Sequence, residues 1–97
     1  MNWYRVRLNG QNFLLNFQDK PQKHGFYTTR DVEAESIEEA ELKAVKLVKE
    51  DDALKNSTIN ETDNSPMIYL EETRILKSDE ERLKNSGYTF YAEDETS

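Results

Sequence analysis

Polar and apolar residues alternate along the first seventeen positions of the chain, and the alternation changes phase once. Before Asn9-Gly10 most large apolar side chains stand at even positions, and after it most stand at odd positions. The two sets are Tyr4, Val6 and Leu8, and Phe13, Leu15 and Phe17. Asn-Gly is typical of a two-residue hairpin turn, which would bring both sets to one face of the paired strands. The pattern therefore predicts an antiparallel hairpin with strands over 2–8 and 11–17.

A third strand is predicted over 26–35, after a polar loop over 18–25 that contains His24. Even positions in this strand face the same core as the hairpin, and odd positions face away from it. The inward set is Phe26, Val32 and Ala34, and the outward set is Tyr27, Thr29, Asp31 and Glu33. Arg30 has the inward parity. We expect it near the sheet edge or at a bulge, because a buried guanidinium without a partner is costly.

A helix is predicted after the capping box formed by Ser36 and Glu39. Its apolar positions follow helical spacing from Ile37 to Val48. Its lysines lie towards the C-terminal end, where the helix dipole favours positive charge. The apolar pair Ala53-Leu54 allows one further turn before a long polar loop.

The last third of the chain contains a fourth predicted strand over 67–76. Its inward residues are Ile68 and Leu70, and its outward residues are Met67, Tyr69, Glu71 and Thr73. Residues 78–87 allow one helical turn, residues 88–91 allow a short edge strand, and residues 93–97 are expected to form a disordered acidic tail. The predicted order is β-β-β-α-β in a single domain over 1–92. This is an α+β fold with one antiparallel sheet and one helix packed on one face.

The composition argues against catalysis and against a bound cofactor or metal. The chain has no cysteine, and His24 is its single histidine. The three glycines are isolated from one another, so the sequence has no glycine-rich phosphate loop. No cluster of histidine and cysteine residues has the spacing of a metal site. We therefore expect a protein that is not an enzyme and that needs no cofactor.

The net charge of −7 is unevenly distributed along the chain. Residues 1–32 carry five basic and two acidic side chains, a balance of +3, whereas the rest carries eight basic and eighteen acidic side chains, a balance of −10. The longest apolar run, over 67–70, is far shorter than the roughly 20 residues that span a bilayer. We therefore expect a cytoplasmic protein that does not enter a membrane.

The sheet face without the helix carries an unusual set of side chains. The candidate interaction face consists of Trp3, Arg5, Arg7, Leu14, Tyr27, Met67 and Tyr69. Aromatic residues, Met and Arg are enriched at protein interfaces, so a protein partner or a second copy of the chain is the favoured occupant. Single-stranded nucleic acid is the alternative, because bases stack on aromatic rings, but the acidic total argues against it. In a third interpretation, part of this face packs under residues 88–91.

Several segments together resemble a family of small bacterial proteins of unknown function. They are WYRVRLNGQNFLLNF, GFYTTRDVEAES, PMIYLEE and the late GYTFY. The resemblance covers nearly the whole chain and implies a bacterial, cytoplasmic setting without an established activity. More loosely, three strands followed by SIEEAELKA are similar to the small α+β domain of HicB-like antitoxins, which implies a regulatory, partner-binding role. The sequence shows no separate DNA-binding segment, so only the partner-binding part of that analogy carries over.

Overall fold

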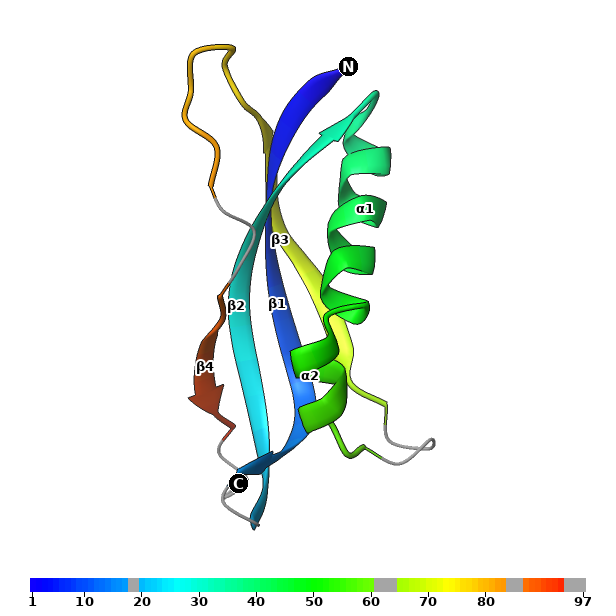
Figure 1. The fold of residues 1–97 in the computed structure, drawn as a ribbon, viewed down its shortest axis with the longest axis vertical. Coiled ribbons are helices and arrows are strands. Elements are labelled where there is room, and N and C mark those ends of the chain that lie inside the picture. The colour runs from blue at the N-terminus through cyan, green and yellow to red at the C-terminus, as the bar shows by residue number, and fades with distance from the viewer. Residues whose placement is uncertain (18–19, 61–64, 84–86, 94–97) are drawn as a thin grey trace.

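The computed structural model describes residues 1–17, 20–60, 65–83 and 87–93. These residues form one four-stranded antiparallel sheet and two helices. The elements are β1 (Asn2–Phe17), β2 (Lys20–Ala34), α1 (Ile37–Lys49), α2 (Asp52–Ser57), β3 (Met67–Ile75) and β4 (Thr89–Ala92). Both helices lie on one face of the sheet (Figure 1). The predicted α+β class with an antiparallel sheet is therefore confirmed, although the order is β-β-α-α-β-β.

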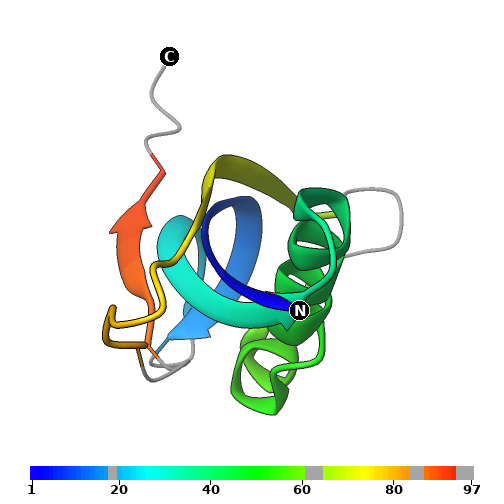
Figure 2. The ribbon, with the colours of Figure 1, turned by 90° about the horizontal axis from the view of Figure 1, so that it is seen from above.

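The two long strands β1 and β2 form the centre of the sheet, whose order is β3-β1-β2-β4. They pair antiparallel along almost their whole length, from Asn2 opposite Ala34 to Phe17 opposite Lys20. Seen from above in Figure 2, the sheet is strongly twisted, with the helices along one side and β4 at the far edge. The sheet therefore has one face covered by helices and one face without them.

The hairpin predicted around Gly10 is wrong, because β1 continues through this position as one strand. The phase change has a different cause. Between Gly10, which pairs with Phe26, and Phe13, which pairs with His24, β1 has one residue more than β2. This bulge contains Asn12, whose φ of 62° lies in the left-handed region. A bulge shifts the alternation by one position, as the turn would, so the two apolar sets still share one face.

The Asn-Gly pair stabilises the sheet instead of forming a turn. The ring of Phe26 lies over Gly10, and a Cβ atom at Gly10 would stand 2.2 Å from that ring. The amide nitrogen of the buried Asn9 side chain donates to the Phe26 carbonyl at 2.9 Å and to the Tyr91 hydroxyl at 3.0 Å. An aromatic ring that covers a glycine of the neighbouring strand is a recognised stabilising device in sheets. The same two residues are therefore compatible with a strand and with a turn.

The loop predicted over 18–25 is largely strand, because β2 begins at Lys20. His24 is consequently a buried strand residue, and the expectation of a solvated loop position is wrong. It pairs with Phe13, and its Nδ1 lies 3.1 Å from the carbonyl oxygen of Gln22. The polar composition of this stretch suggested a loop, but pairing with β1 satisfies its backbone groups in a way that local composition does not reveal.

The core lies between the sheet and the helices. Its buried residues are Tyr4, Val6, Leu8, Phe13, Leu15, Phe26, Val32 and Ala34 from the strands and Ala40, Ala44, Val48 and Leu54 from the helices. The inward position expected for Phe17 falls on a side chain outside the described residues. The Ser36 hydroxyl accepts from the Glu39 amide at 3.1 Å, as the capping box predicts. The further turn predicted around Ala53-Leu54 is confirmed as α2.

A second bulge, at Glu71 of β3, shifts the pairing between β3 and β1. Beyond this residue the alternation of β3 is reversed. Thr73 was predicted to face outward, and this is wrong, because it faces α1 and donates to Oε2 of Glu41 at 2.9 Å. Glu72 and Arg74 take the outward positions instead. An exposed acidic residue at a bulge leaves no hydrophobic signal, so the sequence pattern could not reveal it.

Arg30 is buried, and its guanidinium has partners. It donates to Oγ1 of Thr28 at 2.6 Å and to the Thr29 carbonyl at 3.1 Å, and its Cζ lies 5.1 Å from the centre of the Tyr88 ring. β4 pairs with β2 only from His24 to Tyr27, so Arg30 lies in the part of β2 that borders no described strand on its outer side. Arg30 thus lies at the sheet edge, as predicted, and its buried guanidinium is hydrogen-bonded.

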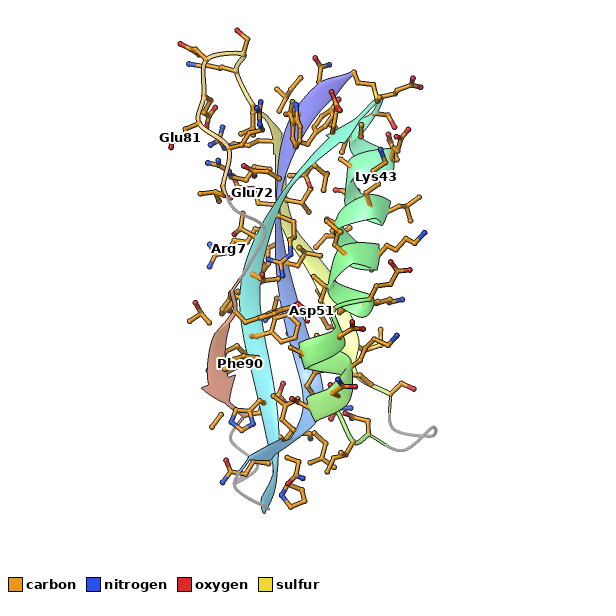
Figure 3. The ribbon with its side chains drawn as sticks, viewed as in Figure 1. Arg7, Lys43, Asp51, Glu72, Glu81 and Phe90 are labelled. Atoms are coloured by element: carbon orange, nitrogen blue, oxygen red, sulfur yellow. The ribbon has the colours of Figure 1, made fainter. Side chains whose placement is uncertain are left out.

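Tyr88 joins the C-terminal part of the chain to the helices. Its hydroxyl donates to Oδ2 of Asp51 at 2.7 Å, and Asp51 also caps α2 by accepting from the Ala53 and Leu54 amides. Burial, together with the hydrogen bond to Asp51, raises the pKa of Tyr88 to about 12. The same hydrogen bond lowers the pKa of Asp51. Figure 3 shows Asp51 at the junction of the two helices, facing the sheet.

The helical turn predicted over 78–87 is absent from the described part of that stretch, residues 78–83 and 87. Most of the predicted acidic tail, residues 94–97, lies outside the described residues. Glu93 is described, and its amide donates to the Lys23 carbonyl at 3.0 Å. The short edge strand predicted over 88–91 is found as β4, shifted by one residue.

Candidate functional site

We call the sheet face opposite the helices the open face. The strand registers place all seven residues of the candidate interaction face on it: Trp3, Arg5, Arg7, Leu14, Tyr27, Met67 and Tyr69. Figure 3 shows the labelled Arg7 and Glu81 on the side of the sheet away from α1 and its Lys43. The seven residues differ in accessibility, because another part of the chain covers some of them.

Asp31 anchors the end of the open face at which β1 begins. Its side chain is 1% exposed. Its carboxylate accepts from Nε of Arg5 at 2.9 Å and from Nη2 of Arg5 at 3.0 Å, and its Oδ2 also accepts from the Leu83 amide at 2.7 Å. The bidentate hydrogen bond with Asp31 raises the pKa of Arg5. The Arg5 side chain is thus held in place by a buried charge.

Residues 77–83, which we call the acidic segment, cover this end of the open face. The Glu81 carbonyl accepts from Nη2 of Arg5 at 3.0 Å. The guanidinium carbon of Arg82 lies 4.6 Å from the centre of the Trp3 ring. Trp3 and Arg5 are therefore half-buried rather than open to a partner, a contact that the sequence did not predict.

Glu80 completes the contact between the acidic segment and the sheet. Its carboxylate accepts two hydrogen bonds from the guanidinium of Arg74 and lies 3.6 Å from Nη1 of Arg5. It also accepts from the Lys77 amide at 3.3 Å. The hydrogen bonds from Arg74 and from the Lys77 amide lower the pKa of Glu80 to about 2. One carboxylate is thus held between two arginines.

The other part of the open face is exposed, and we call it the tyrosine patch. It consists of Arg7, Tyr27, Met67, Tyr69 and Tyr91. Tyr27 is 36% exposed, Met67 50% and Tyr69 45%. Tyr27 and Tyr69 pair with the same residue of β1, Asn9, from its two sides. Because strands lie about 4.8 Å apart, the two tyrosine backbones stand about 10 Å from each other.

Arg7 borders the patch. Its guanidinium carbon lies 4.9 Å from the centre of the Tyr27 ring, and it forms no ion pair with any residue that the structure describes. Glu72 stands opposite it on β3. A cleft of about 540 Å³ adjoins the patch. It is lined by Arg7, Tyr27, Thr28, Thr29, Leu83, Gly87, Tyr88 and Thr89.

Leu14 lies on the open face but apart from the patch, beyond the bulge in β1. Its backbone is bound by the segment after α2: its amide donates to Oδ1 of Asn60 at 2.8 Å, and its carbonyl accepts from the Ile59 amide at 2.9 Å. Its side chain is half-buried. The structure therefore does not bring Leu14 together with Arg7 and Tyr27.

One interpretation of the sequence places part of the open face under residues 88–91, and two of these four residues, Thr89 and Tyr91, lie on that face, because they pair with Tyr27 and Gly25 of β2. Tyr91 lies on the open face, with its ring 5.6 Å from that of Tyr27 and over Gly25, where a Cβ atom would stand 2.2 Å from it. Tyr88 and Phe90 lie on the helix face, where both rings contact Phe26. Sequence reasoning did not assign Tyr91 to the candidate face. The alternation within YTFY could have separated it from Phe90, because neighbouring strand residues point to opposite faces.

The described residues contain no group of three His, Cys, Asp or Glu side chains that could hold a metal ion. Within the same part of the chain, neither helix has the length and apolar character needed to cross a membrane. The arrangement that stands out chemically is thus a surface of aromatic rings and guanidinium groups.

Comparison with known proteins gives no match. No family model, no curated protein and no solved structure matches this chain. The resemblance to small bacterial proteins and to HicB-like antitoxins stays a prediction.

Proposed function

We propose that the chain is a non-enzymatic binding module that recognises a protein, either another chain or a second copy of itself, through the tyrosine patch. The observation that carries this proposal is the exposure of Tyr27, Met67 and Tyr69 beside Arg7 on the open face. Tyr, Met and Arg are enriched in protein interfaces and at positions that dominate binding energy. An exposed group of these residues on a small domain is therefore typical of a contact surface.

The patch is also rigid enough to bind without large reorganisation. Arg7 and Tyr27 stand on the central strands β1 and β2, Met67, Tyr69 and Tyr91 stand on the edge strands β3 and β4, and the Tyr27 ring contacts both Arg7 and Tyr91. Asn9, at the centre, is 3% exposed and hydrogen-bonded within the sheet. Side chains that are ordered before binding lose less conformational entropy when a partner arrives. This favours recognition by a preformed surface.

Single-stranded nucleic acid is the second candidate, because bases stack on aromatic rings such as that of Tyr27 and phosphates bind guanidinium groups such as that of Arg7 beside it. The net charge of −7 opposes it, and Glu72 stands opposite Arg7. We therefore infer that a nucleic acid is not the main partner. An antitoxin-like role would need a protein partner at the same surface.

The test replaces the two most exposed apolar residues of the patch by serine, as Met67→Ser together with Tyr69→Ser. The matched control is Leu42→Ser, since Leu42 is 73% exposed on α1, away from the open face. Sedimentation velocity over a concentration series measures self-association, and affinity capture with quantitative mass spectrometry measures other partners. We expect the patch variant to lose the association and the Leu42 variant to keep it.

Equal behaviour of the two variants in both measurements would contradict the proposal. Anisotropy of a labelled single-stranded RNA separates the second candidate. Tight binding that weakens steeply with salt and requires Arg7 would favour nucleic acid.

A further inference from the structure

The contact between the acidic segment and the sheet has the form of a bound ligand. Residues 77–83 follow β3 directly, and in the described part of the chain they form neither helix nor strand. They are held by side chains of the sheet: the Arg74 guanidinium binds Glu80, and Arg5 binds the Glu81 carbonyl. An acidic stretch that begins with a hydrogen-bonded turn over residues 77–80 is thus recognised through one carboxylate and one backbone carbonyl.

The receptor side of this contact is preorganised. Asp31 holds Arg5 by two hydrogen bonds from beneath, so Arg5 keeps its position whatever lies above it. Arg74 belongs to β3, which pairs with β1. The guanidinium of Arg82, the residue after Glu81, lies over the flat ring of Trp3. The Arg5 guanidinium, which Asp31 holds, and the Arg74 guanidinium lie on the same face as the Trp3 ring, and guanidinium groups suit a planar carboxylate.

The ion pair in this contact is also shallow. The Arg74 side chain is 45% exposed and that of Glu80 is 25% exposed. Ion pairs with this exposure are weak, because water and salt compete with them. The acidic segment can therefore be exchanged for another ligand without unfolding the core.

From these observations we propose that Trp3, Arg5 and Arg74 form a binding site for an acidic peptide segment of a partner protein, and that the chain's own residues 77–83 occupy this site in its absence. The site lies at the other end of the open face from the tyrosine patch and does not depend on the function proposed there.

The charge of the site favours a peptide carboxylate over a phosphate. With Glu80 displaced, Arg5 still binds the buried carboxylate of Asp31, and Glu72 stands near Arg74 on β3. Asp31 pairs with Arg5, so Arg74 is the arginine that loses its ion-pair partner, and one guanidinium suits one monovalent carboxylate. A phosphate with nearly two negative charges would meet two acidic neighbours.

The chain's own segment competes strongly because it is tethered. A tethered ligand acts at an effective concentration of about a millimolar, so a free peptide binds the intact chain weakly. Weakening the internal contact increases the fraction of chains with an open site, and the apparent affinity rises in proportion. This gives the proposal a measurable signature.

The experiment uses the variant Glu80→Gln and the matched control Asp79→Asn, which removes a charge from the same segment at an exposed residue without a described contact to the arginines. Trp3 is the single tryptophan of the chain, so quenching of its fluorescence by acrylamide reports whether the segment covers it. The probe is a labelled peptide Lys-Ser-Asp-Glu-Glu-Arg-Leu with blocked ends, and its anisotropy reports binding. A second peptide carries Gln in place of both Glu residues.

We expect Glu80→Gln to increase the quenching of Trp3 and to bind the acidic peptide about twofold to fivefold more tightly than the wild type. Asp79→Asn should match the wild type, and the Gln peptide should not bind. Adding Arg74→Gln to Glu80→Gln should abolish peptide binding, and the Met67→Ser, Tyr69→Ser variant of the patch should retain it.

Two results would overturn the proposal. In the first, Glu80→Gln exposes Trp3 but binds the acidic peptide no better than the Gln peptide. In the second, Glu80→Gln leaves quenching of Trp3 unchanged. Formation of a dimer by Glu80→Gln in sedimentation velocity would also refute a foreign partner, because the segment would then exchange between two copies of the chain.

Discussion

The two ends of the open face lie on the same strands and begin with similar residues, yet one is covered and the other is exposed. Arg5 and Arg7 stand two positions apart on β1 and point to the same side. Arg5 is bound to the buried Asp31 and to the acidic segment, whereas the Arg7 guanidinium lies over the Tyr27 ring and forms no ion pair with a described residue. The same residue type on one strand can thus serve the fold at one position and remain free for a partner at the next.

The difference arises from what faces each arginine across the sheet. Asp31 and Thr29 are the β2 partners of Arg5 and Arg7. The Asp31 carboxylate binds the Arg5 guanidinium and accepts from the Leu83 amide of residues 77–83. Arg7 stands between Thr29 of β2 and Glu72 of β3 and forms no ion pair with a described residue. The Arg5–Asp31 pair is therefore one of the contacts that hold the covering segment, together with the Arg74–Glu80 pair.

The largest expected effect is a difference between two equal substitutions, Arg5→Leu and Arg7→Leu. Arg5→Leu leaves the buried Asp31 carboxylate without its main partner, so we expect a loss of about 2–4 kcal/mol in the free energy of unfolding. Arg7→Leu should change it by less than about 0.5 kcal/mol. Urea denaturation of both variants measures the difference, and equal losses would show that the two ends are not distinct.

Gly25→Ala tests the exposed end. An added Cβ atom would stand 2.2 Å from the Tyr91 ring, so the ring must leave its place beside Tyr27. We expect a destabilisation of about 1–3 kcal/mol, with no change in acrylamide quenching of Trp3, because the covered end is not disturbed. Thermal unfolding followed by circular dichroism measures the first effect. A change in Trp3 quenching would show that the two ends are coupled.

Tyr88→Phe tests how the chain is held between the acidic segment and β4, since Tyr88 lies between these two segments in the sequence. It removes the hydrogen bond to Asp51, and we expect a loss of about 1 kcal/mol in the free energy of unfolding. The matched control is Tyr69→Phe, because the exposed Tyr69 hydroxyl has no hydrogen bond in the described structure. Chemical denaturation should show no loss for the control, and a loss equal to that of Tyr88→Phe would contradict the assignment.

The same hydroxyl predicts a pH dependence at alkaline pH. Its pKa is raised from 10.0 in the unfolded chain to about 12 in the folded chain by burial and by Asp51, with Arg30 acting in the opposite direction. The contribution of the protonated Tyr88 hydroxyl to the free energy of unfolding is complete below pH 10 and is lost as the pH rises towards 12, because Tyr88 ionises at a lower pH in the unfolded chain. Urea midpoints measured through this window should fall more steeply for the wild type than for Tyr88→Phe.

The smallest effect concerns the acidic segment at low pH. The pKa of Glu80 is lowered from 4.5 to about 2, so its contact with Arg74 is complete above pH 4.5 and is lost as the pH falls towards 2. Arg5, Lys77, Glu72 and Asp31 are the other charged groups around this contact. Quenching of Trp3 should rise through this window in the wild type. Glu80→Gln should show high quenching throughout, and a rise of equal size in that variant would assign the transition to another group.

Much of the fold could be predicted from local patterns. The capping box at Ser36 marked the start of α1, and the apolar positions of β1 and β2 gave the correct core face. Of the candidate face, Arg7, Tyr27, Met67 and Tyr69 form the exposed patch as a group, because alternation determines which side of a strand a residue occupies. Whether the patch binds a protein stays a prediction.

The failures arise where strands pair with distant partners. Gly10 was misassigned because a bulge and a turn shift alternation equally, and Thr73 because a second bulge reverses alternation in β3. His24 was misassigned because a polar stretch can become a strand when a long partner pairs with it. The covering of Arg5 by residues 77–83 could not be predicted, since it depends on contacts between residues more than seventy positions apart.

The order of the amino acids by itself determined the core face of β1 and β2, the start of the helix and the absence of thiol chemistry. Only the tertiary structure decided that β1 continues through Asn9-Gly10, that Tyr91 joins the open face, and that Trp3 and Arg5 are covered. The physical reason is that side-chain direction is a local property of the backbone. The choice of pairing partner is settled by the free energy of distant segments that meet in the folded chain.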